Sequence, residues 1–276
     1  MTQNQSTGTA LITGASSGIG AVYAERLARR GHDLVLVARN TGKLESLAGT
    51  LAKSTGRRVE VLSADLSNTG EVKRVAEFLQ SRRDISLLVN NAGVGAGSPL
   101  LEADIDAMES MIALNTTAVT RLAYAAARAF VARGSGTIIN IASIVAVAPE
   151  LLNGVYGASK AYVLALSQSM RHELESKNVK VQVVLPGAIA TDFWRASGVP
   201  IEVLPSEMVM SSADLVDAAL AGLDLGEFVT VPSLPEAADW DRLENARQAL
   251  RPNLSRNVPA PRYQVAGSGT STGVSH

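Results

Sequence analysis

A tyrosine and a lysine four residues apart, Tyr156 and Lys160, are the side chains of this sequence whose types and spacing most clearly suggest chemistry. They stand where a helical pattern begins. Side chains at this spacing project from the same face of a helix, so the Lys160 ammonium is expected beside the Tyr156 phenol. A phenol ionises near about pH 10, and a neighbouring positive charge lowers its pKa. The spacing therefore predicts a tyrosine that can exchange protons near neutral pH.

The same spacing has a second interpretation. Short motifs often match by chance, and the tyrosine could be a boundary aromatic beside a solvated lysine. The elements around the pair must decide between the two interpretations.

Alternating strand and helix patterns must position this pair. Strands are predicted at 9–13, 33–38, 58–63, 85–90, 137–142, 179–185 and 227–231. Helices are predicted at 19–30, 43–53, 71–82, 156–177 and 212–223, and the segment 102–133 reads as two helices with a break near Asn115. Strands that are apolar on both faces suit a sheet covered by helices on each side. The pattern therefore predicts an α/β fold, a Rossmann-type doubly wound seven-stranded parallel sheet.

The chain is expected to form a single domain over residues 8–251. The long connection 188–211 is predicted to act as a lid, because connections of this length in compact domains are usually functional or mobile. The tail 252–276 is rich in proline, glycine, serine and threonine and has little apolar pattern. Such a composition predicts a flexible or surface-draped segment.

The composition excludes several classes of function. The chain has 276 residues, no cysteine, a formal net charge of -1 and 46% hydrophobic residues. Without cysteine there is no disulfide, thiolate metal site or cysteine nucleophile, and the three histidines lack ligand spacing, so no metal site is predicted. A charge near zero gives no reason to expect nucleic acid or an anionic membrane as partner. The polar start and the lack of an apolar run of ~20 residues favour a cytoplasmic protein.

Three glycines follow the first predicted strand and open the first helix. Gly14, Gly18 and Gly20 have the spacing G-x-x-x-G-x-G. Glycines let a diphosphate approach the backbone, and the following helix N-terminus offers free N–H groups and the positive end of its dipole. The turn therefore predicts a nucleotide site, and a plain strand-to-helix turn is the alternative.

The end of the second strand indicates which nucleotide this is. NAD-binding folds usually place an acidic residue there, whereas an arginine suits the 2′-phosphate of NADP. Here Arg39 occupies the strand end, and the Ser16 hydroxyl could reach the same phosphate. NADP(H) is therefore favoured over NAD(H), and a merely solvated strand-end arginine is the alternative.

The motifs that resemble a known family are spread over residues 8–231. They are Thr13-Gly14-x-x-x-Gly18-x-Gly20, Asn90-Asn91-Ala92-Gly93, Asn115, Ser143, Tyr156-x-x-x-Lys160 and Pro186-Gly187. In this combination and order the sequence resembles the short-chain dehydrogenase/reductase family. The resemblance favours the catalytic interpretation of the tyrosine.

The resemblance implies roles for four catalytic side chains. Tyr156 would be the general acid in ketone reduction and the base in alcohol oxidation. Ser143 would donate a hydrogen bond to the substrate oxygen. Lys160 would lower the tyrosine pKa and hold the nicotinamide ribose, and Asn115 would hold a water that relays protons from Lys160 to solvent.

The glycine turn, the strand ends and the resemblance together predict the contacts with the cofactor. These are Gly14, Ser16, Ser17, Gly18, Ile19, Gly20, Arg39, Asp65, Leu66, Asn91, Ala92, Gly93, Tyr156, Lys160, Pro186, Gly187, Ile189 and Thr191. Two of them have local alternatives, because Asp65 could cap the next helix and Asn91 could belong to a strand-end turn.

The substrate side is predicted to be apolar. Its expected residues are Ser143, Val145, Leu152, Tyr156, Phe193 and Trp194. An apolar pocket with one hydrogen-bonding pair suits a hydrophobic ketone, aldehyde or secondary alcohol. Arg195 in the predicted lid leaves an acidic or carrier-bound substrate open.

These observations favour an NADP(H)-dependent oxidoreductase acting on a carbonyl or secondary alcohol. Two alternatives are an NAD-linked alcohol dehydrogenase on the same fold and a non-catalytic nucleotide-binding redox sensor. The resemblance further implies a homodimer or homotetramer that pairs through the helices at 117–133 and 156–177.

Overall fold

The computed structural model describes residues 7–197 and 200–263, with the side chains of residues 195 and 196 also outside the description. The chain divides into two compact units, residues 1–233 and 234–276. The first unit contains the sheet and the candidate site.

The sheet has seven parallel strands in the order β3-β2-β1-β4-β5-β6-β9, which confirms the sequence prediction. Its strands are β1 (Thr9–Thr13), β2 (Asp33–Ala38), β3 (Val59–Ser63), β4 (Ile85–Asn90), β5 (Gly136–Ile141), β6 (Val179–Val184) and β9 (Val229–Thr230). The order reverses direction between β1 and β4. Ligands of doubly wound sheets bind at such a switch point, outside the carboxyl ends of the strands.

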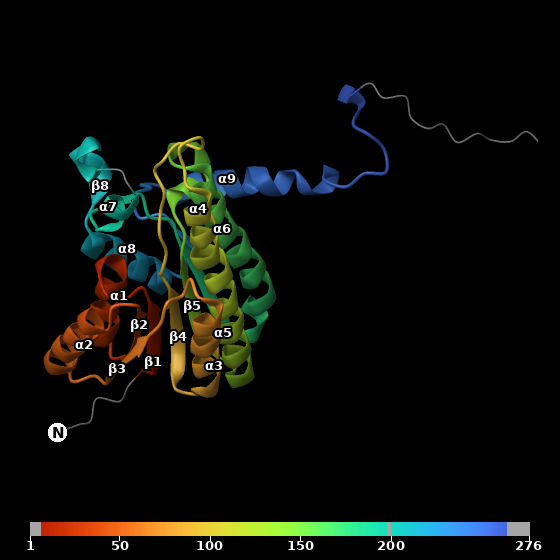
Figure 1. Cartoon of the computed structure of the whole chain (residues 1–276). Helices are drawn as coiled ribbons and strands as arrows, with labels where there is room; N and C mark the ends of the chain where they lie inside the picture. The colour runs from red at the N-terminus through yellow and green to blue at the C-terminus, as the bar shows by residue number, and fades with distance from the viewer. Residues whose placement is uncertain (1–6, 198–199, 264–276) are drawn as a thin grey trace, which may run out of the picture. The chain divides into compact units, whose positions relative to one another are not determined.

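Helices cover both faces of this sheet (Figure 1). On one face lie α1 (Gly18–Arg29), α2 (Thr41–Thr55) and α8 (Ser212–Leu225), and on the other α3 (Thr69–Ser81), α5 (Val119–Arg133) and α6 (Gly154–Leu174). Neighbouring residues of a strand face opposite sides. Ile12 of β1 accordingly packs with the first group of helices and Leu11 with the second.

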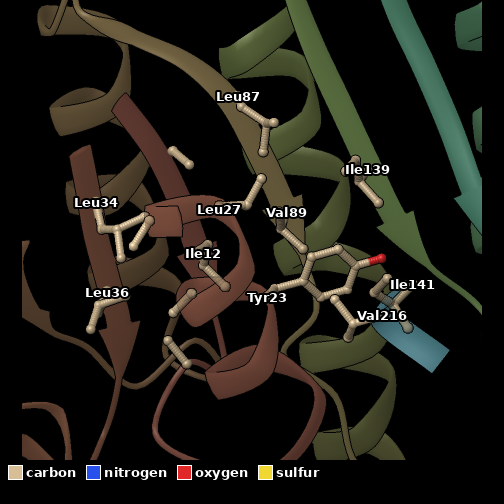
Figure 2. Close-up of a cluster of buried hydrophobic side chains, with 14 of the residues drawn as sticks. Ile12, Tyr23, Leu27, Leu34, Leu36, Leu87, Val89, Ile139, Ile141 and Val216 are labelled. Atoms are coloured by element: carbon tan, nitrogen blue, oxygen red, sulfur yellow. The ribbon is translucent and has the colours of Figure 1, made fainter. Parts of the chain in front are cut away.

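One apolar core joins the sheet to α1 and α8 (Figure 2). Tyr23 of α1 lies fully buried in this core. Its hydroxyl has no hydrogen-bond partner within residues 7–197 and 200–263, and burial raises the pKa of the phenol. A buried phenol of this kind stays neutral, because placing an unpaired phenolate in an apolar core would cost roughly several kcal/mol.

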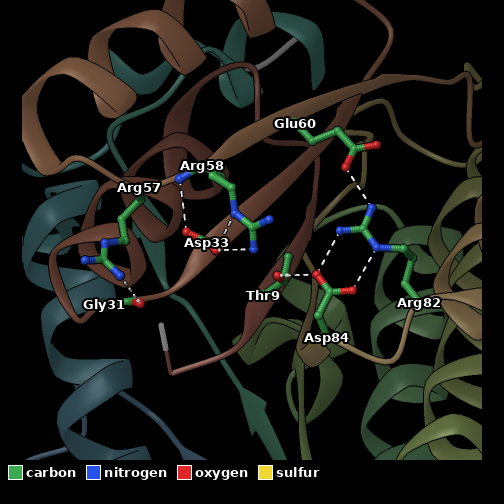
Figure 3. Close-up of polar contacts among 8 residues, drawn as sticks. All are labelled: Thr9, Gly31, Asp33, Arg57, Arg58, Glu60, Arg82 and Asp84. Atoms are coloured by element: carbon green, nitrogen blue, oxygen red, sulfur yellow. Dashed lines mark hydrogen bonds and ion pairs between the residues drawn. The ribbon is translucent and has the colours of Figure 1, made fainter. Parts of the chain in front are cut away.

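Charged side chains bind one another where the strands begin (Figure 3). Asp84, just before β4, accepts hydrogen bonds from Arg82 and from the Thr9 hydroxyl of β1. Asp33 at the start of β2 accepts from Arg58, which precedes β3. The Arg82 guanidinium holds the pKa of the Asp84 carboxyl well below its usual range. These ion pairs link the beginnings of neighbouring strands, at the edge of the sheet opposite the carboxyl ends.

The helix interruption predicted near Asn115 is a wide, π-helical segment. It spans Ala113–Ala118 and joins α4 (Ile105–Ile112) to α5 without a break in the rod. Single π-helical turns of this kind often occur at functional sites. Asn115 lies buried within it.

The connection predicted as a lid contains ordered elements. It begins with β7 (Ala188–Ile189) and α7 (Phe193–Ser197), and ends with β8 (Val209–Met210) after two short 3₁₀ turns, Ile201–Val203 and Ser206–Met208. Strands β7 and β8 pair in parallel, and the Ala190 N–H donates to the Met210 carbonyl at 2.9 Å. The two ends of the connection are therefore held together, and its movement as a lid stays a prediction.

The second unit contains α9 (Ala237–Ala249) and the short turns Arg251–Asn253 and Pro261–Tyr263. No described residue of α9 is buried. The division between the two units falls before α9, and the domain bounds expected from the sequence stay a prediction. Residues 264–276 of the predicted tail lie outside the described residues.

A search of the described helices for a membrane-spanning segment finds none of sufficient length and apolar character.

Candidate active site

A cavity of about 690 Å³ opens at the carboxyl ends of the strands of the first unit. The predicted residues that line it are Gly14, Ser16, Ser17, Gly18, Ile19, Arg39, Asp65, Leu66, Asn91, Ala92, Gly93, Ser143, Tyr156, Lys160, Pro186, Gly187, Ile189, Thr191, Phe193 and Trp194. Residues that follow six different strands are thus gathered around one space, as expected for a parallel sheet.

The glycine turn between β1 and α1 forms one wall. Gly14 and Gly18 have positive φ angles of 65° and 53°. Residues with a Cβ rarely adopt this backbone conformation. The turn brings the start of α1 to the cavity, where helix N–H groups favour an anion. A phosphate group of a nucleotide fits this wall.

Asn91 holds the turn from the neighbouring strand end. Its side-chain N–H donates to the Thr13 carbonyl at 2.9 Å and to the Gly14 carbonyl at 3.3 Å. The Thr13 hydroxyl in turn accepts from the backbone N–H groups of Asn91 and Ala92. Asn91 therefore links the end of β4 to the glycine turn and shapes the cavity wall.

Gly20 does not line the cavity, contrary to its predicted place among the cofactor contacts. A Cβ on this residue would collide with the Gly14 carbonyl and come within 2.6 Å of the Asn91 side-chain nitrogen. The third glycine therefore lets α1 pack closely against the turn.

The strand ends of β2 and β3 place a cation near a carboxylate. Arg39 is exposed at the cavity, and within the described part of the chain its guanidinium forms no ion pair. Asp65 accepts hydrogen bonds from the Ser67 hydroxyl and N–H at 2.6 and 2.9 Å. These bonds, with the Arg39 charge, lower the pKa of the Asp65 carboxyl. Asn68, not Asp65, caps α3.

Ser143, Tyr156 and Lys160 come together at the centre of the cavity. Ser143 follows β5, and the other two lie on the first turns of α6, which Asn153 caps by accepting from the Val155 N–H at 2.9 Å. All three are buried. The Ser143 hydroxyl donates to the Pro186 carbonyl at 3.3 Å and lies close enough to Tyr156 to act on the pKa of its phenol. The Lys160 ammonium lies 5.9 Å from the centroid of the tyrosine ring.

The pKa values of the pair differ from the sequence prediction. Burial raises the pKa of Tyr156 to about 12, although the hydrogen bond with Ser143 opposes the change. Burial also lowers the pKa of Lys160 to about 8, and its ammonium donates to the Ile141 carbonyl at 3.0 Å. The effect of burial on the pKa of Tyr156 is therefore larger than the lowering by the Lys160 charge that the spacing predicted. At neutral pH the phenol therefore keeps its proton.

Asn115 does not line the cavity but supports it from behind. Its side chain accepts from the Val94 N–H at 3.0 Å and donates to the Val94 carbonyl at 2.9 Å. It also donates to the Ser159 hydroxyl at 3.1 Å. A Cβ on Gly93 would lie 3.1 Å from the Asn115 oxygen and 3.4 Å from the Lys160 nitrogen. Asn115 therefore holds the chain beside Lys160, and its water relay stays a prediction.

The part of the cavity beside Tyr156 is aromatic. Phe193 lies 5.6 Å from Tyr156 and 5.7 Å from Trp194, measured between ring centroids. The Trp194 indole N–H donates to the Ile189 carbonyl at 2.8 Å. Both aromatic residues line the cavity as predicted.

Two of the predicted substrate residues do not line the cavity. Val145 is buried in an apolar cluster with Met108, Met111 and Tyr156, and Leu152 packs against this cluster. Both follow β5 in short turns that direct them toward α4. Their apolar character suits a core as well as a pocket, so composition alone could not separate the two environments.

One wall was missed by the sequence interpretation. Ala107, Ser110, Met111 and Leu114 line the cavity from α4 and its continuation. Their spacing of three and four residues places them on one helix face. This periodicity is visible in the sequence and could have identified the wall.

Comparison with known proteins identifies relatives over most of the chain. A family model described as short chain dehydrogenase matches residues 8–199. Human 17-beta-hydroxysteroid dehydrogenase type 3 is 37% identical over 185 residues, which cover 66% of this chain and 59% of that protein. The chain thus spans about three fifths of the length of this curated relative.

Two solved structures are similar over nearly the whole chain. The short-chain dehydrogenase from Sphingobium yanoikuyae in complex with NADPH is 48% identical, with a TM-score of 0.90, covering 93% of this chain and 99% of that chain. The bulky-bulky ketone specific alcohol dehydrogenase from Comamonas testosteroni is 44% identical, with a TM-score of 0.86, covering 94% of this chain and 99% of that chain. With this fold, this cavity and a matching family model, the chain belongs to the short-chain dehydrogenase/reductase family of oxidoreductases.

Proposed function

We propose that this chain is an NADP(H)-dependent oxidoreductase that reduces a bulky, hydrophobic ketone to a secondary alcohol or catalyses the reverse reaction. One observation carries the proposal. The Tyr156 phenol, with its pKa raised to about 12, lies beside Ser143 in a cavity whose wall next to the tyrosine is aromatic. A proton donor and a hydrogen-bond donor beside an apolar wall suit the carbonyl of a hydrophobic molecule.

The residues of the cavity fit a nicotinamide dinucleotide. The glycine turn and the start of α1 would hold the diphosphate, Asp65 and Leu66 would lie at the adenine, and Pro186 and Gly187 would lie at the nicotinamide end. When bound, the cofactor supplies the hydride. The protein supplies position, the proton and the exclusion of water.

Tyr156 protonates the oxygen of the reduced carbonyl in this proposal. Ser143 donates a hydrogen bond to the same oxygen and so stabilises the negative charge that develops there. The pKa of Lys160 is lowered to about 8, which is near neutral pH and below the pKa of Tyr156. The Lys160 ammonium can therefore return a proton to the phenolate afterwards. In oxidation the same groups act in reverse.

The substrate class rests on the aromatic end of the cavity and on two relatives. Phe193 and Trp194 present apolar surface near Tyr156. The relatives named above are a hydroxysteroid dehydrogenase and a bulky-bulky ketone specific alcohol dehydrogenase. One name states a hydroxysteroid and the other a bulky-bulky ketone, which supports a bulky ketone here.

A panel of carbonyl compounds tests the proposed function. It contains small ketones, ketones with two bulky substituents and keto acids, each assayed with NADPH and with NADH. Turnover should be greatest for bulky hydrophobic ketones with NADPH. A higher kcat/KM with NADH would instead favour the NAD-linked alcohol dehydrogenase. Binding of NADPH without turnover of any carbonyl would favour the redox sensor.

Arg39→Asp is predicted to reverse the cofactor preference. Arg39 is exposed at the cavity where a 2′-phosphate would lie, and a carboxylate there would repel the phosphate and accept from a free ribose hydroxyl. We expect kcat/KM for NADPH to fall by about 100-fold, because a charge-assisted contact with the phosphate is lost. The kcat/KM for NADH should change by less than about 10-fold. Arg57→Asp, which also replaces an arginine but outside the cavity, is the matched control. An unchanged NADPH preference in Arg39→Asp would contradict the assigned role.

We also propose that the chain forms a homo-oligomer through α5 and α6. Tyr124 of α5 is 52% exposed, and a hollow lined by α3, α5 and α6 lies around it. An exposed aromatic side chain on a helix face is typical of a protein interface.

A further inference from the structure

A glycine outside the cavity wall lies directly against the aromatic substrate end. Gly95 belongs to the connection between β4 and α4. A Cβ on Gly95 would overlap the Phe193 ring, coming within 2.6 Å of Cε2 and 3.0 Å of Cε1. Real Cβ atoms essentially never approach a carbon this closely, because repulsion rises steeply below the contact distance of about 3.5 Å. The absence of a side chain at residue 95 is therefore required by the position of the Phe193 ring.

The backbone of Gly95 gives no other reason for a glycine. Its φ is not among the positive values of the described residues, so φ does not require a glycine here. The three atoms nearest to a Cβ at this position all belong to the Phe193 ring. The pair is therefore a specific contact between two connections that are far apart in the sequence.

Both connections are held in place near this contact. The Gly97 N–H donates to the Ser197 carbonyl at the end of α7, at 2.9 Å. The Asn153 side chain donates to the Ser98 carbonyl at 2.7 Å. Because the chain beyond Gly95 is bonded both to α7 and to the cap of α6, it cannot easily move away from the ring.

Phe193 faces the cavity on its other side. It lines the cavity, whereas Gly95 does not. Its ring is tilted by 49° against that of Tyr156 and stands edge-on at 84° to that of Trp194. A ring backed by Gly95 and packed beside the candidate proton donor sets how much room a substituent of the carbonyl has.

We propose that Gly95 is a positioning residue that fixes the Phe193 ring beside Tyr156, and that this ring sets the size of the ketone substituent accepted there. The proposal rests on the proposed function, because it refines which ketones that same site accepts. A Cβ at residue 95 would push the ring into the cavity, and removal of the ring would enlarge the cavity.

The test is a cycle of Gly95→Ala, Phe193→Ala and the double variant, assayed with one small and one bulky ketone. Gly95→Ala should raise KM for the bulky ketone and lower its kcat/KM by at least about 10-fold, because displaced groups misalign the substrate. Phe193→Ala should raise the ratio of kcat/KM for the bulky over the small ketone by about 10-fold, the scale of pocket-size effects. In the Phe193→Ala background, Gly95→Ala should have no further effect, because nothing is left to displace.

Gly154→Ala is the matched control. Gly154 opens α6, and a Cβ there would meet no atom within 4 Å. The control should therefore show the small-ketone and bulky-ketone kinetics of the parent protein.

A fluorescence measurement tests the contact without turnover. The chain has two tryptophans, so Trp240→Phe leaves Trp194, which stands edge-on to Phe193, as the single indole. Gly95→Ala in this background should change the emission of Trp194 and its quenching by acrylamide. The same substitution should change neither when Phe193 is already alanine.

The outcomes separate this proposal from the proposed function. If the parent protein reduces no ketone but Gly95→Ala alters Trp194 emission only when Phe193 is present, the proposed function fails and the positioning of the ring stands. If Gly95→Ala leaves both the kinetics and the emission unchanged, or lowers kcat/KM equally with and without Phe193, the positioning role is overturned.

Discussion

Tyr156→Phe is expected to lower kcat for ketone reduction by about 100-fold or more, the usual contribution of a positioned general acid. The substitution removes one oxygen atom and keeps the ring that packs against Phe193 at 5.6 Å. Ser143 remains as a hydrogen-bond donor, but the reduced oxygen loses its source of a proton. Binding of NADPH, measured by its protection against thermal unfolding, should change little.

Tyr162→Phe provides the control on the same helix. The Tyr162 hydroxyl is hydrogen-bonded to Thr120 at the surface, at 2.7 Å, and is not part of the cavity. Its removal should leave kcat within about 2-fold, because it takes one hydroxyl from the surface and none from the cavity. A Tyr156→Phe protein as active as this control would show that another group donates the proton.

The pH dependence of the parent protein follows from the same environment. Because burial raises the pKa of Tyr156 to about 12, the phenol of the free protein keeps its proton throughout the neutral range. A fall in kcat/KM for reduction as pH rises through about 8 would therefore report Lys160, whose pKa is lowered to about 8 by burial.

The sheet and the edge that carries the site could be predicted because their signals are local. Apolar runs of four to six residues and the glycines after β1 depend on neighbouring residues only. Once the strands are parallel, their carboxyl ends must meet at one edge. Gly14, Arg39 and Ser143 follow different strands and could therefore be assigned to one cavity from the sequence.

Whether a residue faces the cavity or the core could not be predicted in the same way. Gly20 and Val145 stand near cavity residues in the sequence, yet Gly20 packs α1 against the turn and Val145 enters the core. The orientation of a short turn is set by what packs on it, here α4 and the start of α6. Contacts of this kind, like that between Gly95 and Phe193, join segments with no shared sequence signal.

The degree of burial was also hidden from the sequence. The spacing of Tyr156 and Lys160 correctly predicted two neighbours on a helix, but desolvation depends on every element packed around them. The structure buries both groups, and this reverses the direction of the pKa change predicted for the phenol.

Lys160→Met is expected to abolish ketone reduction and to stabilise the fold at pH 7. Lys160 is buried, and its ammonium donates to the Ile141 carbonyl at 3.0 Å. Burial lowers its pKa from 10.5 to about 8, which corresponds to about 3 kcal/mol of lost stability when the group is charged, at about 1.4 kcal/mol per pKa unit. Methionine fills a similar volume without charge, and loss of the hydrogen bond costs about 1 kcal/mol. The expected gain in the free energy of unfolding is therefore about 1 to 2 kcal/mol.

The sign of the pH dependence distinguishes this cause from better packing. Below about pH 8 the lysine is charged in both the folded and the unfolded state, so the cost of burying the charge is fully present. Between about pH 8 and 10.5 the unfolded state binds the proton and the folded state does not, so the stability of the parent protein rises with pH. The advantage of Lys160→Met, measured by urea unfolding at pH 7 and pH 9.5, should therefore shrink at the higher pH.

Lys177→Met is the matched control, because Lys177 is exposed just after the same helix. Its stability should stay within about 0.5 kcal/mol of the parent protein at both pH values. A Lys160→Met protein that is less stable than the parent at pH 7, or whose advantage is the same at both pH values, would contradict a buried charge as the cause. The expected pattern would mean that the buried Lys160 ammonium lowers the stability of the fold. The proposed reaction requires a group at this position that can return a proton to Tyr156. Functional residues often lower stability in this way.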